Sequence, residues 1–96
     1  MINRLHLEIL RAVQTEGSLS DAARGLCLTQ SALSHSIRKL EQALGMKVWA
    51  RHGRSLRLTR AGNMLLSLAN RILPDIEHVE LLVGKPSRGE ERLLRI

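Results

Sequence analysis

The stretch that decides the fold is SLSDAARGLCLTQSALSHSIRKLEQALG, residues 18–45. It contains two short amphipathic segments joined at LCLT, and we predict one helix over 19–26 and another over 30–44. Ser18 and Thr29 are typical N-cap residues, Asp21 is placed to complete a capping box with Ser18, and Gly45 is a typical helix stop. The pattern therefore predicts two helices joined by a tight turn.

The second of these helices has two unlike faces. Its apolar side chains are spaced four, three and four residues apart and predict the buried face: Leu33, Ile37, Leu40 and Leu44. Its first two turns carry small polar side chains, where a helix meant only for packing would carry Ala, Glu or Lys. Gln30 can pair with an adenine edge, Ser34 and His35 can bond base edges or phosphates, and Ala32 can abut a thymine methyl. The first turns are therefore suited to the major groove of DNA.

The flanking sequence completes a mainly α, winged helix-turn-helix prediction: three helices, a two-stranded β-hairpin wing and a long linker helix. A first helix is predicted over 4–15, with Gly17 as its stop. KVWAR and SLRLT alternate with a period of two, which predicts a hairpin with Gly53 in its turn. We expect a DNA-binding domain over 1–59, a linker and dimerisation helix over 60–83 capped by Thr59, and a hinge over 84–96 that includes the strand-like RLLRI.

Positive charge is concentrated in one window. The net charge of the chain is +6, and the window 38–60 holds seven basic residues and one acid, so it accounts for the whole excess. Such a footprint favours a polyanionic partner. In the hairpin, Arg51 and Arg54 are the better candidates for phosphate or minor-groove contacts and Arg57 a weaker one, while Trp49 is expected to pack under the wing.

Composition argues against other functions. The single aromatic residue disfavours an OB-fold or RRM, which stack bases on aromatic side chains. The sequence has no phosphate-binding loop, nucleophile elbow or paired carboxylates, and its four histidines and Cys27 lack metal-ligand spacing. We therefore expect no enzyme, no metal and no cofactor in this chain.

The cellular setting follows from the apolar segments. No apolar run approaches the length of a membrane span, and the N-terminus lacks the features of a signal peptide. Cys27 stands in an apolar context and cannot form an internal disulfide, so we expect a buried thiol in a reducing cytoplasm and no membrane partner.

The long helix carries an apolar stripe with spacings of three and four, too long for the small domain to cover entirely. We expect a homodimer through this stripe, whose members are Leu65, Leu68, Ile72, Ile76, Val79 and Val83. A two-fold dimer would place two recognition helices in successive major grooves, on an inverted repeat.

Residues 5–74 resemble the N-terminal domain of LysR-type transcriptional regulators, through AA…L…TQSALS…I..LE..LG, the arginine in the wing and LT.AG. QSALSH, LEQALG and LLSLANRILP further resemble the branch that regulates methionine biosynthesis. The resemblance implies sequence-specific binding of double-stranded DNA by a bacterial transcriptional regulator, with a dimer through the long helix. The implied DNA contacts are Thr29, Gln30, Ser31, Ala32, Ser34, His35, Arg38, Arg51 and Arg54.

The resemblance also implies that a small-molecule effector binds a C-terminal domain absent from this chain, and that a full-length protein can form tetramers. We expect a truncated piece of such a regulator, with a naturally short regulator as the alternative. Ser31 stands where many members have Pro and His35 where many have Arg, so the preferred bases are expected to differ.

The rival interpretation is a winged-helix module that binds proteins and not DNA, because a fold does not settle a function. The placement of charge distinguishes the two. A protein adaptor has no need for its entire net charge to lie on the second helix of the motif and the wing.

Overall fold

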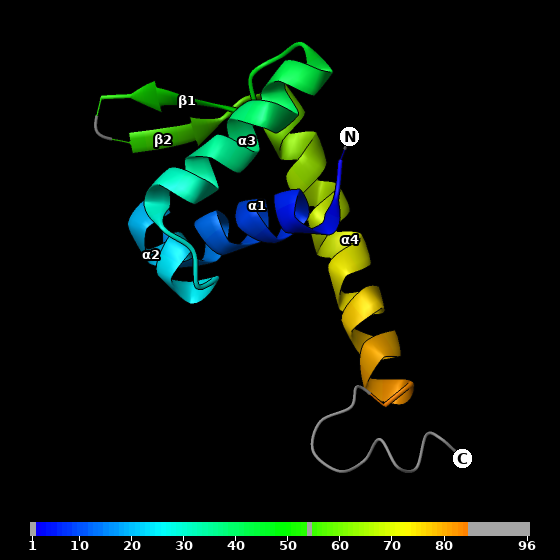
Figure 1. The fold of residues 1–96 in the computed structure, drawn as a ribbon. Coiled ribbons are helices and arrows are strands. Elements are labelled where there is room, and N and C mark those ends of the chain that lie inside the picture. Colours follow the sequence, from blue (N-terminus) through cyan, green and yellow to red (C-terminus); the bar gives the residue numbers. More distant parts are fainter. Residues whose placement is uncertain (1, 54, 85–96) are drawn as a thin grey trace.

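A computed structural model describes residues 2–53 and 55–84 (Figure 1). The element order is α1 (Arg4–Glu16), α2 (Leu19–Gly25), α3 (Gln30–Leu44), β1 (Trp49–His52), β2 (Ser55–Leu58) and α4 (Arg60–Leu82). This confirms the winged helix-turn-helix followed by a long helix. Arg54 and the expected hinge beyond Gly84 lie outside the described residues.

Local capping explains where the helices begin and end. Ser18, Thr29 and Thr59 each accept a hydrogen bond from a first-turn backbone N–H, as N-caps do. Gly17 and Gly45 end α1 and α3 with φ of 85° and 72°, the left-handed region that glycine enters without steric cost. These five positions confirm the sequence predictions, with helix ends shifted by at most one residue.

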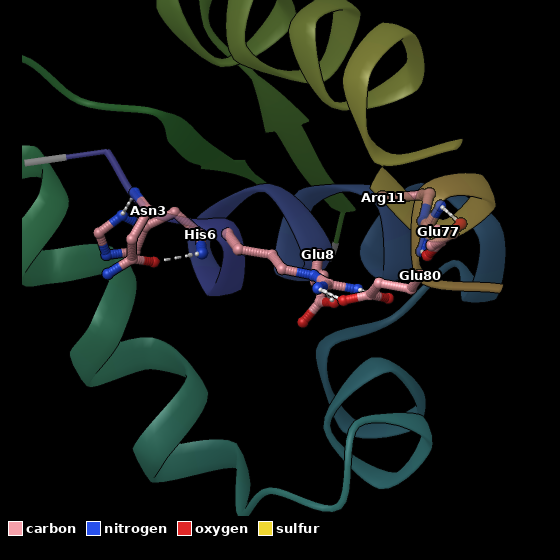
Figure 2. A network of polar contacts seen from close by, with 7 residues as sticks. Asn3, His6, Glu8, Arg11, Glu77 and Glu80 are labelled. Carbon is pink, nitrogen blue, oxygen red and sulfur yellow. Dashed lines mark hydrogen bonds and ion pairs between the residues drawn. The ribbon is translucent and has the colours of Figure 1, made fainter. Parts of the chain in front are cut away.

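The capping box forms at a different helix from the one predicted. Asp21 pairs its carboxylate with Arg24 at 3.0 Å, and the reciprocal bond to Ser18 is not among the α2 cap contacts. A capping box forms instead at α1, where the His6 backbone N–H donates to Asn3 Oδ1 at 3.0 Å. In return, the Asn3 N–H donates to His6 Nδ1 at 3.1 Å (Figure 2).

The core lies where α1, α2 and α3 meet the start of α4. Its fully buried side chains include Ile9, Leu10, Leu33, Ile37 and Leu40, joined by Val48 ahead of the hairpin. A second cluster joins Leu7 of α1 to Ala69 and Leu73 of α4. The last fully buried apolar side chain of α4 is therefore Leu73, and Figure 1 shows the remaining turns extending past the other helices.

The hairpin is tied to the start of α4 by Thr59. Its N–H donates to the Val48 carbonyl at 2.9 Å, and its hydroxyl donates to the Lys47 carbonyl at 2.7 Å while accepting from the Gly62 N–H at 3.1 Å. Because one side chain bonds both segments, the base of the wing and the first turn of α4 are held together.

Cys27 is exposed, so the expectation of a buried thiol is wrong. Its φ is 60°, and the Leu28 N–H donates to the Ala23 carbonyl at 2.8 Å while the Cys27 N–H donates to that of Arg24 at 3.1 Å. This is the Schellman pattern, with a cysteine in the place glycine usually takes. The reversal turns its side chain to solvent, which an apolar neighbourhood in sequence does not reveal.

Candidate nucleic-acid interface

Helix α3 divides as its sequence predicts. Leu33, Ile37 and Leu40 are at most 1% exposed and face the core. Ser34 is half-buried, and the remaining predicted contacts on this helix are exposed: Gln30, Ser31, Ala32, His35 and Arg38. The polar face of α3 is thus accessible, as the face of a helix that enters a DNA groove must be.

The start of α3 is fixed by the turn before it. Thr29 Oγ1 accepts from the Ala32 N–H at 3.0 Å, so its oxygen is engaged in capping while the hydroxyl hydrogen can still be donated. Because Thr29 is also exposed, it can cap the helix and reach a phosphate at the same time.

Sequence reasoning missed Ser20. Its hydroxyl lies 3.4 Å from Gln30 Oε1, across the gap between α2 and α3. An acceptor held by Ser20 leaves the Gln30 amide N–H₂ turned to solvent as a donor. No spacing rule within one helix could have identified this pair, because the two residues belong to different helices.

Two neighbouring hollows lie between α3 and the wing. One, of about 450 Å³, is lined by Ser34 and Arg38 of α3 and by Trp49 and Arg51 of the hairpin, among others. The second, of about 420 Å³, is lined by Ser18, Ser20, Gln30 and Arg51. Arg51 borders both, so the structure gathers predicted contacts from α3 and the wing on one concave surface.

The hairpin register separates its arginines. Arg51 lies opposite Leu56, and Arg57 lies opposite Ala50. Since successive strand residues point to opposite faces, Arg51 and Arg57 are on different sides of the wing. Trp49 is half-buried against the core, in agreement with its expected packing role.

The one acid in the basic window is turned inward. The Glu41 side chain is 10% exposed, and its Oε2 accepts from the Val48 N–H at 2.8 Å. Lys47 Nζ lies 4.0 Å from its other oxygen. The carboxylate thus holds the segment between α3 and the hairpin, while Arg38 and Arg51 remain exposed at the surface.

Among the described residues, the titratable groups with clearly altered pKa values lie away from this surface. His6 lies beside Asn3 at the start of α1, and the arginine–glutamate pairs join α1 to α4 (Figure 2). Burial lowers the pKa of His6. Hydrogen bonding to Glu77 raises the pKa of Arg11, and the same contact lowers the pKa of Glu77. Hydrogen bonding to Glu80 raises the pKa of Arg4. These groups support the fold rather than the exposed face of α3.

The predicted dimer stripe on α4 is covered unequally. Leu65 is 8% exposed in the domain's own core, which leaves little of it for a partner. Leu68, Ile72 and Ile76 are half-buried. Val79 and Val83 are 56% and 57% exposed, and Met64 and Leu82 add further exposed apolar surface. An apolar face therefore runs along the outer side of α4.

The described ranges 2–53 and 55–84 hold no grouping of three or more His, Cys, Asp or Glu suited to a metal ion. Among those residues there is also no helix with the length and apolarity that crossing a bilayer requires.

Comparison with known proteins points to one family. Residues 5–63 match the family described as "Bacterial regulatory helix-turn-helix protein, lysR family". The HTH-type transcriptional regulator MetR of Salmonella typhimurium is 42% identical over 93 residues, which cover 97% of this chain. The chain spans 29% of the length of that relative.

Solved structures agree in fold. The crystal structure of a BenM_DBD/catB site 1 DNA complex matches with a TM-score of 0.77 at 28% identity, covering 88% of this chain and 94% of the other. A CbnR_DBD–DNA complex matches with a TM-score of 0.73 at 28% identity, covering 91% and 100%.

Proposed function

The chain belongs to the lysR family of bacterial regulatory helix-turn-helix proteins, and from this premise we propose how it engages DNA. Helix α3 lies in the major groove of a duplex, with its first two turns toward the bases. Arg51 and Arg54 of the wing contact phosphates or the adjoining minor groove. The family is one of regulators and not of enzymes, and the proposed role is sequence-specific binding at an operator.

One observation carries this proposal: the concave surface on which Gln30, Ser34, Arg38 and Arg51 come together. Groups that can read base edges stand beside groups that can neutralise phosphates, and that combination suits duplex DNA. Glu41, the one carboxylate of the basic window, also lines this concave surface, but its side chain is only 10% exposed and accepts a hydrogen bond from the Val48 N–H. The complexes of BenM_DBD and CbnR_DBD with DNA add support from related folds.

The residues take different roles. Gln30, Ser31, Ala32, Ser34 and His35 face the bases. Thr29, Arg38, Arg51 and Arg54 contact the backbone. The contribution of the three arginines is salt-dependent, because each phosphate that they neutralise releases counterions.

We also propose a homodimer through the outer face of α4. An exposed stripe that includes Val79 and Val83 is apolar surface a second copy can cover. Two-fold pairing presents two copies of α3 to an inverted repeat. A small-molecule effector that binds a further domain, as family resemblance implies, would act by changing this arrangement.

A selection from a random duplex pool, followed by a salt titration on the selected sequence, tests the proposal. We expect an inverted repeat whose affinity falls steeply as salt rises. A protein-binding module would instead recover no common sequence and show no binding to duplex DNA at low salt.

A further inference from the structure

We propose that two arginine–glutamate pairs between α1 and α4 set the angle at which the dimerisation helix leaves the DNA-reading domain, and so fix the spacing between half-sites. The inference rests on the proposed dimeric DNA binding. It assigns Arg4, Arg11, Glu77 and Glu80 as positioning residues that touch neither DNA nor the dimer face.

Full burial of apolar side chains covers only the first part of α4. Buried side chains on α4 end at Leu73, which packs with Ala69 against Leu7 of α1. Beyond Leu73 the same side of the helix continues with the half-buried Ile76, three positions on, and with Glu77 and Glu80, four and seven positions on. The two glutamates make the polar contacts between α1 and this part of α4.

Each of the two arginine–glutamate pairs makes a two-point contact between α1 and α4. The two terminal nitrogens of the Arg11 guanidinium, Nη1 and Nη2, donate to the Glu77 carboxylate at 3.1 and 2.6 Å. Arg4 bonds both oxygens of Glu80, with Nη2 to Oε1 at 3.1 Å, and its Nε donates to Glu8 at 3.0 Å (Figure 2). Two-point contacts of this kind fix orientation as well as distance.

The two pairs contact α4 from separate points along α1. Arg4 and Arg11 are seven residues apart on α1, about 10 Å along its axis, whereas their partners are three apart on α4, about 4.5 Å. A single apolar patch at Leu7 would allow α4 to rotate relative to α1. Contacts from two separate points of α1 resist that rotation. Because α4 joins the two domains of the proposed dimer, a small rotation at α1 shifts one copy of α3 relative to the other.

The pairs are half-exposed, with side chains 33–40% accessible, so each is expected to add little to the free energy of unfolding. Their proposed effect is on the angle between α1 and α4. Glu77→Gln keeps the side-chain size and removes the charge. The double exchange Arg11→Glu with Glu77→Arg restores the pair in reverse. Glu16→Gln, at the exposed end of α1, is the control with the same change in charge.

The first test measures the angle without DNA. Spin labels at Gln14 of α1 and Leu81 of α4, in a Cys27→Ser background diluted with unlabelled protein, report the distance between the helices. We expect one narrow distance distribution in the parent and in Glu16→Gln, a broader one in Glu77→Gln, and a narrow one again in the double exchange. An unchanged distribution in Glu77→Gln overturns the inference.

The second test measures spacing. Each protein selects from the same random duplex pool, and the spacing between inverted half-sites is counted. We expect one dominant spacing for the parent and Glu16→Gln. In Glu77→Gln we expect the preference for that spacing to be roughly two- to fivefold weaker, because a half-exposed ion pair contributes only a small energy. Equal preference in all variants overturns the inference and leaves the proposed function intact. Failure of the parent to select any inverted repeat overturns both.

Discussion

Gly62 lies so close to Val48 that a Cβ added to Gly62 would stand 2.1 Å from the Val48 carbonyl oxygen. That carbonyl already accepts the Thr59 N–H at 2.9 Å, so it is not free to move away. The approach of α4 to the segment that leads into the wing thus depends on a residue without a side chain.

Gly62→Ala is expected to lower the free energy of unfolding by about 2 kcal/mol or more, because backbone must shift to admit the methyl group. Urea denaturation measures it. Gly25→Ala is the matched control, since the nearest atom to an added Cβ there is 4.0 Å away. That variant should be neutral or gain up to about 1 kcal/mol. Equal effects from the two would contradict the packing at Val48.

His6 is expected to make stability depend on pH. Burial lowers its pKa below the ordinary 6.5, so the unfolded chain binds the proton more readily than the folded one. Stability is therefore full above about pH 6.5 and falls as the pH drops below it. Denaturation curves at about pH 7.5 and 5.5 measure the loss.

His6→Gln should reduce that loss, because a glutamine can still accept the Asn3 N–H and does not titrate. His78→Gln is the control, since His78 is exposed on α4. If His78→Gln removed the pH dependence and His6→Gln did not, the assignment would be wrong.

Arg51→Ala is expected to weaken binding to all duplexes alike and to reduce the slope of log affinity against log salt by about one unit. Fluorescence anisotropy across a salt series measures both. Arg57→Ala is the matched control, because Arg57 lies on the other face of the same hairpin. A larger loss from Arg57→Ala would reverse the proposed orientation of the wing.

Val79→Glu is expected to weaken the dimer by about 3 kcal/mol, roughly a hundredfold, because a carboxylate would be buried in an apolar interface. Val79 is 56% exposed in the single chain, so the fold should survive. Sedimentation measures the association. Ser67→Glu places the same charge on the exposed side of α4 away from the stripe. A dimer indifferent to Val79→Glu would mean that the copies meet elsewhere.

The features that the sequence predicted correctly are those that depend on interactions between residues close together in the chain. Ser18, Thr29 and Thr59 cap helices by accepting a hydrogen bond from the backbone N–H three residues further along the chain. Leu33 and Ile37 are four residues apart, which places both on the buried face of a helix. Features that depend on how the helices pack together could not be predicted from the sequence. Periodicity alone could not show that Leu65 faces the domain's own core, because Leu65 is in register with the apolar stripe of Leu68 and Ile72.

The candidate site shows the same division. The exposed face of α3 follows from its pattern, but the contact of Ser20 with Gln30 and the inward turn of Glu41 depend on how helices cross. The pairing of Arg11 with Glu77 joins residues 66 positions apart. Cys27 shows the limit most plainly, since its exposure follows from one left-handed backbone angle.

The most direct test of the central claim, that α3 reads bases in the major groove, is a scan of the selected duplex with 7-deazapurines. This change removes the purine N7 acceptor and leaves the minor groove intact. We expect the parent to lose affinity at particular purines in each half-site, and Gln30→Ala to become insensitive at one of them, where about 1–3 kcal/mol of discrimination is lost. A parent protein indifferent to every such substitution would contradict the account.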